Sequence, residues 1–102
     1  MTNIEASRAA LVARILEGDA RTPQAQRRAA FDDSGLPEPL RVLVDKVAHR
    51  APAVRDEDFA AARTSGLSED QLFELVVCAA VGQASRQYDA ARAALDAATQ
   101  EE

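Results

Sequence analysis

The sequence predicts an all-α fold, a compact bundle of about six helices that forms one domain over residues 1–102. Helix starts with capping residues are followed by apolar residues at spacings of three and four, and Gly or Pro residues separate these segments. The β-branched pair Val76-Val77 suggests a strand. A capped start and flanking alanines outweigh that suggestion, so we expect helices only.

The first helix is expected over residues 2–17, where Thr2 or Asn3 can cap the start and Gly18 ends it. Its apolar residues form one stripe, made of Ile4, Leu11, Val12, Ile15 and Leu16. The second helix is short and extends toward Phe31. It opens at Thr22-Pro23, which has the pattern of an N-cap followed by a first-turn proline.

The turn Asp32-Asp33-Ser34-Gly35 ends the second helix, and two prolines lead into a third. Apolar residues at helical spacing form that third helix, which Pro52 stops: Leu40, Leu43, Val44 and Val47. Asp56 can cap a fourth helix that extends through Arg63, and Gly66 is its natural C-terminal residue.

The fifth helix, over residues 68–81, is expected to be the most buried. Ser68 and Gln71 form a capping box at its start. It is apolar on every side from Leu75 to Val81, which is typical of a helix in the middle of a fold. A sixth helix is expected beyond Gly82, although the sequence leaves open whether Gly82 separates two helices or kinks one. Its small-residue face holds Ala84, Tyr88, Ala91, Leu95 and Ala98.

Large apolar side chains are few in this chain. Alanine supplies 23 of the 102 residues, whereas Val, Ile, Leu and Phe together supply 22. A thin core leaves a small domain with little stability, and alanine-lined helices pack closely enough for association to supply more. We therefore expect a homo-oligomer.

The charge and the apolar runs exclude several classes of partner. The formal net charge is −5, with +1 on residues 1–51 and −6 on residues 52–102, so nucleic acid is not an expected partner. The longest apolar run, residues 75–81, is far below the roughly 18 residues of a membrane span. Charged residues near the N-terminus do not fit a signal peptide, and a single cysteine excludes an internal disulfide. We expect a cytoplasmic protein without a membrane partner.

A family resemblance follows from the second half of the chain. Gly66-Leu67-Ser68-Glu69-Asp70, then Leu72-Phe73-Glu74, a small-residue apolar run and Arg86-x-x-Asp89 resemble the carboxymuconolactone decarboxylase and alkyl hydroperoxidase D-like family. The segment of residues 43–48 is similar to the helix that leads into that family's active centre, so the resemblance covers about residues 36–98. It implies an all-helical subunit of a symmetric oligomer.

The peroxidase members of that family carry a Cys-x-x-Cys-x-x-x-His motif. Counted back from Gly66, the two thiol positions are Ala51 and Val54, and the histidine position is Asp58. Peroxide reduction requires one thiolate that attacks and a second that resolves the sulfenic acid. Thiol peroxidase activity is therefore not expected. The remaining cysteine, Cys78, is interpreted as a small apolar residue in the fifth helix.

A set of polar residues surrounds the positions where that motif would lie. His49 and Asp58 are the candidate catalytic residues, and Arg50, Arg55 and Arg86 are the candidate ligand-binding residues for a small anionic molecule. Structural roles compete with these, since a cation such as His49 suits a helix C-terminus and Arg86 can pair with Asp89 or Glu74. We predict no cofactor and no metal ligand.

Two functional hypotheses follow. The favoured one is a non-catalytic or small-ligand-binding helical oligomer that keeps the family scaffold without its thiol redox centre. The alternative is a decarboxylase- or lactone-type enzyme that uses His49 with nearby Arg and Asp side chains. A pocket lined by His49, Arg50 or Arg86 would favour the enzyme.

Overall fold

The computed structural model describes residues 2–100, and these residues form helices, turns and no strand. The all-α prediction is therefore confirmed. The elements are α1 (Thr2–Glu17), α2 (Gln24–Asp32), α3 (Leu40–His49), a 3₁₀ turn η1 (Ala51–Ala53), α4 (Asp56–Arg63) and α5 (Glu69–Gln100).

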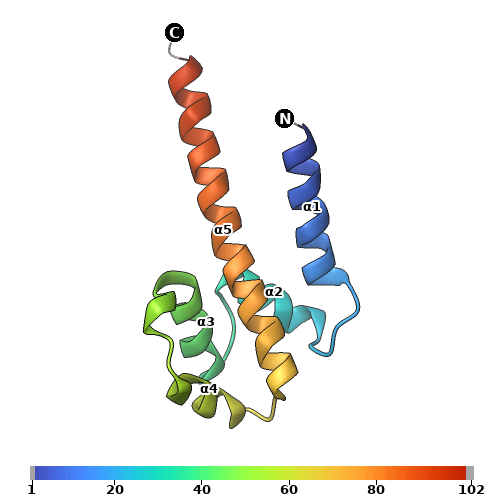
Figure 1. Cartoon of the computed structure of the whole chain (residues 1–102), viewed down its shortest axis with the longest axis vertical. Helices are drawn as coiled ribbons and strands as arrows, with labels where there is room; N and C mark the ends of the chain where they lie inside the picture. Colours follow the sequence, from blue (N-terminus) through green and yellow to red (C-terminus); the bar gives the residue numbers. More distant parts are fainter. Residues whose placement is uncertain (1, 101–102) are drawn as a thin grey trace.

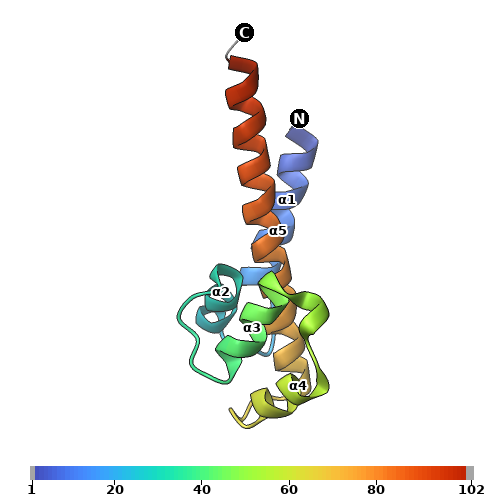
Figure 2. The ribbon, with the colours of Figure 1, turned by 90° about the vertical axis from the view of Figure 1, so that its left-hand side faces the viewer.

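The long helix α5 is the axis of the molecule. It has 32 residues, and the molecule extends 54 × 29 × 20 Å. Figures 1 and 2 show α2, α3 and α4 gathered around its N-terminal half. The first helix, α1, lies antiparallel to the C-terminal half, so the two helices form an arm that extends from the rest of the fold (Figure 1).

The core lies where α2 and α3 pack against the N-terminal half of α5. Leu43, Leu72 and Leu75 are among its largest fully buried side chains. The remaining buried members of this cluster are Ala30, Leu36, Leu40, Val44, Ala62, Cys78 and Ala79. The predicted position of the segment around residues 75–81 in the middle of the fold is confirmed. Its apolar residues do not all face the core, however, because Ala80 is exposed and three valines of the segment are half-buried.

The prediction of about six helices is wrong at Gly82, where α5 continues without a break through Gln100. A Cβ atom at Gly82 would lie 1.9 Å from the backbone oxygen of Phe31 and 2.7 Å from its carbonyl carbon. Glycine therefore lets the C-terminal end of α2 approach the axis of α5. Its cost in a helix interior is about 1 kcal/mol relative to alanine, which packing against α2 offsets.

Three local signals in the sequence have their expected structures. Gln71 N–H donates to Ser68 Oγ at 3.1 Å, and Ser68 N–H donates to Gln71 Oε1 at 2.9 Å, so the capping box is confirmed. Gly66 follows α4 with φ of +93°, a conformation that favours glycine. Asp33 ends α2 in the left-handed region with φ of 52°.

Three predicted helix caps are wrong. Asn3 lies inside α1, and Asp56 is the first residue of α4 rather than its cap. The N–H of Arg55, at the cap position of α4, donates to the Asp58 carboxylate at 2.9 Å. Thr22 lies two residues before α2, and its hydroxyl donates to Glu74 on α5 at 2.6 Å. A strong acceptor from a distant helix has replaced the local partner that a cap would use.

Candidate functional site

The predicted catalytic residue Asp58 joins α4 to α3. Its carboxylate accepts hydrogen bonds from Lys46 Nζ at 3.0 and 3.1 Å, and its side chain is 12% exposed. The backbone N–H of Arg55 and the Lys46 ammonium together lower the pKa of Asp58 below its ordinary value. Asp58 is thus an ionised partner in a contact between two helices.

The other predicted catalytic residue, His49, is the last residue of α3. Its Nε2 atom lies 3.0 Å from Asp33 Oδ2 and 3.9 Å from Asp45 Oδ1. Asp33 comes from the end of α2, whereas Asp45 lies one turn before His49 in α3. The fold therefore gives His49 two carboxylate neighbours, and neither was among the predicted site residues.

The predicted ligand-binding arginines lie at separate places. Arg50 and Arg55 are exposed on either side of η1. Arg86 Nη1 donates to the Phe31 carbonyl at 2.7 Å, and its other nitrogens bond Gln83. Its partners are therefore neither Asp89 nor Glu74, the two carboxylates expected from helix geometry. Arg86 instead caps the C-terminal end of α2, next to the contact at Gly82.

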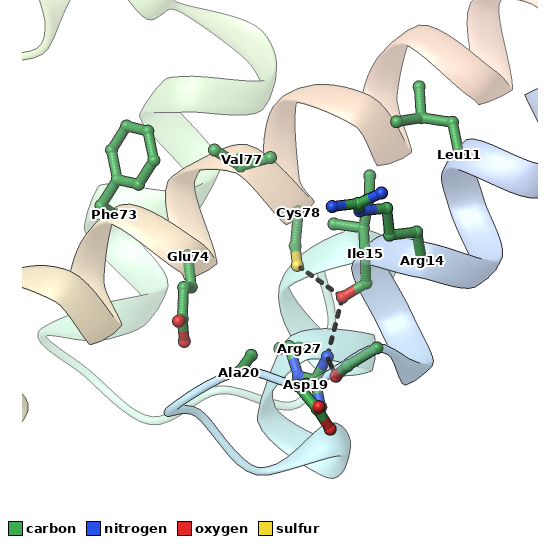
Figure 3. Close-up of a pocket in the computed structure, with 11 residues that line it drawn as sticks. Leu11, Arg14, Ile15, Asp19, Ala20, Arg27, Phe73, Glu74, Val77 and Cys78 are labelled. Atoms are coloured by element: carbon green, nitrogen blue, oxygen red, sulfur yellow. Dashed lines mark hydrogen bonds between the residues drawn. The ribbon is translucent and has the colours of Figure 1, made fainter.

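A groove of 580 Å³ opens on another side of the molecule, between α1, the turn after it and the N-terminal half of α5 (Figure 3). Its apolar wall is formed by Leu11, Ile15, Phe73 and Val77. Polar and small residues complete the lining: Arg14, Gly18, Asp19, Ala20, Arg27, Glu74 and Cys78. None of the five site residues predicted from the sequence lines this groove.

Arg27 is a buried cation beside this groove and is 4% exposed. Its Nη1 donates to the carbonyls of Ile15 at 3.0 Å and Gly18 at 2.9 Å, and its Nε donates to Thr22 at 2.9 Å. The carbonyls at the end of a helix have no partner within the helix and carry the negative end of its dipole. Arg27 therefore fixes the end of α1 and the following turn, which form one side of the groove.

Glu74 holds the same turn from α5. Its Oε1 accepts from Thr22 N–H at 2.8 Å and from the Thr22 hydroxyl, while Oε2 accepts from Arg21 N–H at 3.1 Å. Burial by itself would raise the pKa of Glu74, but these hydrogen bonds outweigh burial and lower it. The carboxylate is thus ionised and committed to the turn, with Arg27 as a further favourable charge.

Cys78 lies at the groove but has no exposed surface of its own. Burial raises the pKa of its thiol to about 11, a shift that Arg27 opposes and Glu74 supports. A thiol with this pKa is almost entirely protonated at neutral pH, so it is a poor nucleophile.

A second, smaller groove of 240 Å³ lies beside the first. Phe73 is 66% exposed and lines both grooves. The other lining residues of the second groove are Phe59, Arg63, Glu69, Leu72 and Val76. The two grooves therefore form one largely apolar surface, with Phe73 in its middle.

Sequence reasoning missed Arg27 and Glu74 as site residues. Nothing in the local pattern distinguishes Arg27 from the exposed Arg28 beside it, because its partners lie 5 to 12 residues earlier in the chain. Glu74 belongs to the segment that carries the family resemblance, but its partner Thr22 is 52 residues away. The polar residue before Pro23 is the one available signal, and local pattern alone predicts a helix cap there.

No protein-family model, curated protein or solved structure matches the chain. The family assignment therefore stays a prediction that rests on the residues quoted for the resemblance. Within residues 2–100, no helix combines the length and the apolar character that crossing a bilayer requires.

Proposed function

We propose that this chain is a non-catalytic subunit of a helical homo-oligomer, related to the carboxymuconolactone decarboxylase and alkyl hydroperoxidase D-like family, that binds a small anionic molecule. The observation that carries the proposal is the groove between α1 and α5. Its 580 Å³ volume lies within the range of ligand pockets, about 300–1,000 Å³.

The chemistry of the groove favours an amphipathic anion. Leu11, Phe73 and Val77 offer an apolar wall, and Arg14 is an exposed cation between this wall and the turn. The Glu74 carboxylate is ionised, but its hydrogen bonds to the turn and the nearby charge of Arg27 offset part of its repulsion of an anion. A carboxylate with a short apolar tail would place its tail on the wall and its charge near Arg14.

A ligand-binding role suits these residues better than thiol chemistry does. The two thiol positions of the family motif are Ala51, in η1, and Val54, just after it. The one cysteine of the chain has a raised pKa and no exposed surface. Neither of the two grooves is lined by His49 or Asp58, so the favoured ligand site does not include the predicted acid and base.

The test titrates the chain with octanoate and with octanol, a matched pair of probes. Binding is followed by the NMR shifts of the backbone amides of α5. Both probes should bind and shift the amides around Val77. Arg14→Ala should weaken octanoate binding about three- to tenfold and leave octanol binding unchanged, because only octanoate carries a charge. Arg28→Ala, at an exposed position outside the groove, is the matched control.

Val77→Asp should abolish binding of both probes by placing a charge on the apolar wall. The proposal is wrong if neither probe shifts these amides, or if Val77→Asp binds both probes as the native chain does. If Arg14→Ala and Arg28→Ala weaken octanoate binding equally, the anionic preference is wrong, because general charge then explains it.

The homo-oligomer in this proposal is supported by apolar side chains that the single chain leaves exposed. Leu95 on α5 is 61% exposed, and Ile4 on α1 is 56% exposed. The C-terminal half of α5 also presents exposed alanines. A second copy that packs on this arm would bury these side chains at little loss of side-chain entropy.

A further inference from the structure

Three side chains with metal-binding atoms converge at the end of α3, away from both grooves. His49 Nε2, Asp33 Oδ2 and Asp45 Oδ1 all lie within 4.8 Å of one another. From these residues we infer a binding site for one divalent transition-metal cation of the zinc class. The inference goes beyond the proposed function, which concerns a different surface of the molecule.

The spacing of the donor atoms suits such a cation. Zinc binds imidazole nitrogen at about 2.0–2.1 Å and carboxylate oxygen at about 2.0–2.2 Å, so neighbouring ligands of a tetrahedral ion lie about 3.3 Å apart. The histidine nitrogen is 3.0 Å from the Asp33 oxygen and 3.9 Å from the Asp45 oxygen. These two distances bracket the required one, and the two carboxylate oxygens lie within 4.8 Å of each other. Rotation of the half-exposed His49 and Asp45 side chains can supply the difference.

The backbone holds the three ligands on one side. Asp45 and His49 are four residues apart in α3, so both project from one face of the helix. Asp33 is held at the end of α2, where its N–H donates to the Ala30 carbonyl at 3.1 Å, and its side chain is 16% exposed. Ligands from two elements therefore meet without any change in the backbone.

The charge at this cluster is the second observation that points to a cation. Within residues 2–100, the only ion-pair partner of Asp33 or Asp45 is His49. The nearest lysine in the helix, Lys46, is instead bound to Asp58. Two carboxylates thus share one imidazole, and a dication would compensate both negative charges. A protonated His49 is the competing explanation, and it supplies only one positive charge.

Imidazole nitrogen and carboxylate oxygen are both zinc ligands, and three protein ligands leave the fourth tetrahedral position open to water. The order of affinities of such sites for divalent ions favours zinc over manganese and iron. The two protein ligands on α3 and the third on α2 would also tie these helices together when the ion is bound. Binding should therefore stabilise the fold as well as occupy the site.

The experiment titrates the full chain, free of any histidine tag, with Zn²⁺ by calorimetry and follows the one imidazole of the chain by NMR. We expect one Zn²⁺ per chain, a shift of the His49 Nε2 resonance and a higher melting temperature. His49→Gln, Asp33→Asn and Asp45→Asn should each weaken binding at least about tenfold, since even the loss of an outer partner of a metal ligand costs that much.

Asp32→Asn is the matched control, because Asp32 precedes Asp33, is exposed and lies outside the cluster. It should bind Zn²⁺ as the native chain does. The inference is overturned if the His49 resonance does not move when Zn²⁺ is added. Equal losses in the Asp32 and Asp33 variants would overturn it too, because they would indicate diffuse binding to surface carboxylates. The NMR titration of the native chain decides the matter even if a variant does not fold.

Discussion

Glu74 and Arg27 are the residues that set the shape of the groove, and both act on the turn between α1 and α2. Arg27 donates to two carbonyls at the end of α1, and Glu74 accepts from two backbone N–H groups of the turn. Buried or partly buried charges are costly unless they are hydrogen-bonded, so their value lies in fixing one conformation of the turn.

A first prediction concerns the pH dependence that Glu74 confers. Because its pKa is lower in the folded chain than its ordinary value of 4.5, ionised Glu74 stabilises the fold above that pH. This contribution is lost as the pH falls through the pKa of the folded state. Glu74→Gln should therefore unfold at lower urea concentration than the native chain near pH 7, and the difference should shrink in acid.

The measurement is the urea midpoint across about pH 3 to pH 7. Thr22→Val, which removes the hydroxyl donor to Glu74, should change the profile in the same direction. Glu57→Gln controls for the loss of one exposed negative charge. A midpoint difference that stays constant across the pH range would show that Glu74 acts through packing rather than through its charge.

A second prediction concerns Cys78. With a pKa of about 11, the thiolate fraction at pH 7 is on the order of 10⁻⁴. Labelling of the native chain with a disulfide reagent should therefore be slow until denaturant is added, and hydroperoxide consumption with a dithiol reductant should equal the blank. Fast native labelling together with peroxide turnover that Cys78→Ser abolishes would contradict both the thiol assignment and the proposed function.

At the scale of helices, α5 is held along its length by two different kinds of contact. Its N-terminal half packs into the apolar core with α2 and α3. Its C-terminal half contacts α1 through charged groups. Arg8 pairs with Asp89 at 3.1 Å and lies 4.9 Å from the centre of the Tyr88 ring, and Arg92 pairs with Glu5. Exposed ion pairs contribute about 0–1 kcal/mol each, so the arm is the weaker half of the single chain.

A third prediction tests the contact between α2 and α5. Gly82→Ala should destabilise the fold by about 1–3 kcal/mol, because the added Cβ would overlap the Phe31 backbone, which cannot rotate away. Helix propensity alone predicts the opposite sign, a gain of about 1 kcal/mol. The sign of the change in the free energy of unfolding, measured by urea denaturation, therefore separates the two effects.

Ala84→Gly is the matched variant for this comparison, since Ala84 is exposed in the same helix. It should lose about 0.5–1 kcal/mol through propensity alone. If Gly82→Ala stabilises the chain, the close contact between the Phe31 backbone and Gly82 is wrong.

At the scale of the whole molecule, the chain leaves several large apolar side chains in contact with water. These exposed large apolar residues are Ile4, Leu11, Val42, Phe73 and Leu95. Ile4 and Leu95 lie on the arm, Leu11 and Phe73 line the grooves, and Val42 lies on α3, so these residues do not form one patch. Scattered exposed apolar residues are common in folded proteins. Because the core of this chain is thin, burying these residues in an oligomer would add a large share of the total stability.

The last prediction is that the chain sediments as a homo-oligomer at micromolar concentration, at a multiple of its 10.9 kDa mass. Leu95→Asp should shift the population toward the single chain by placing a charge in the arm interface. Ala97→Asp, two residues further along α5 and therefore on another face, is the matched control. Analytical ultracentrifugation that finds only a 10.9 kDa species in the native chain would refute the homo-oligomer.

Much of the fold follows from short-range patterns in the sequence. The capping box at Ser68, the glycine after α4 and the break after Asp32 each depend on residues within four positions of one another, and all three are confirmed. Periodic apolar residues likewise predicted the helices, because a helix is stabilised by neighbours one turn apart. The order of the helices could therefore be predicted without any knowledge of their packing.

The tertiary structure alone decided which residues act together. Thr22 bonds Glu74 rather than its own helix, Gly82 lies inside α5 with the Phe31 backbone against it, and His49 meets Asp33 from another element. In each case the partner lies 16 to 52 residues away, and the sequence contains no period that relates such positions. Local propensities are worth about 1 kcal/mol per residue, so a single long-range contact of similar or greater value overrides them.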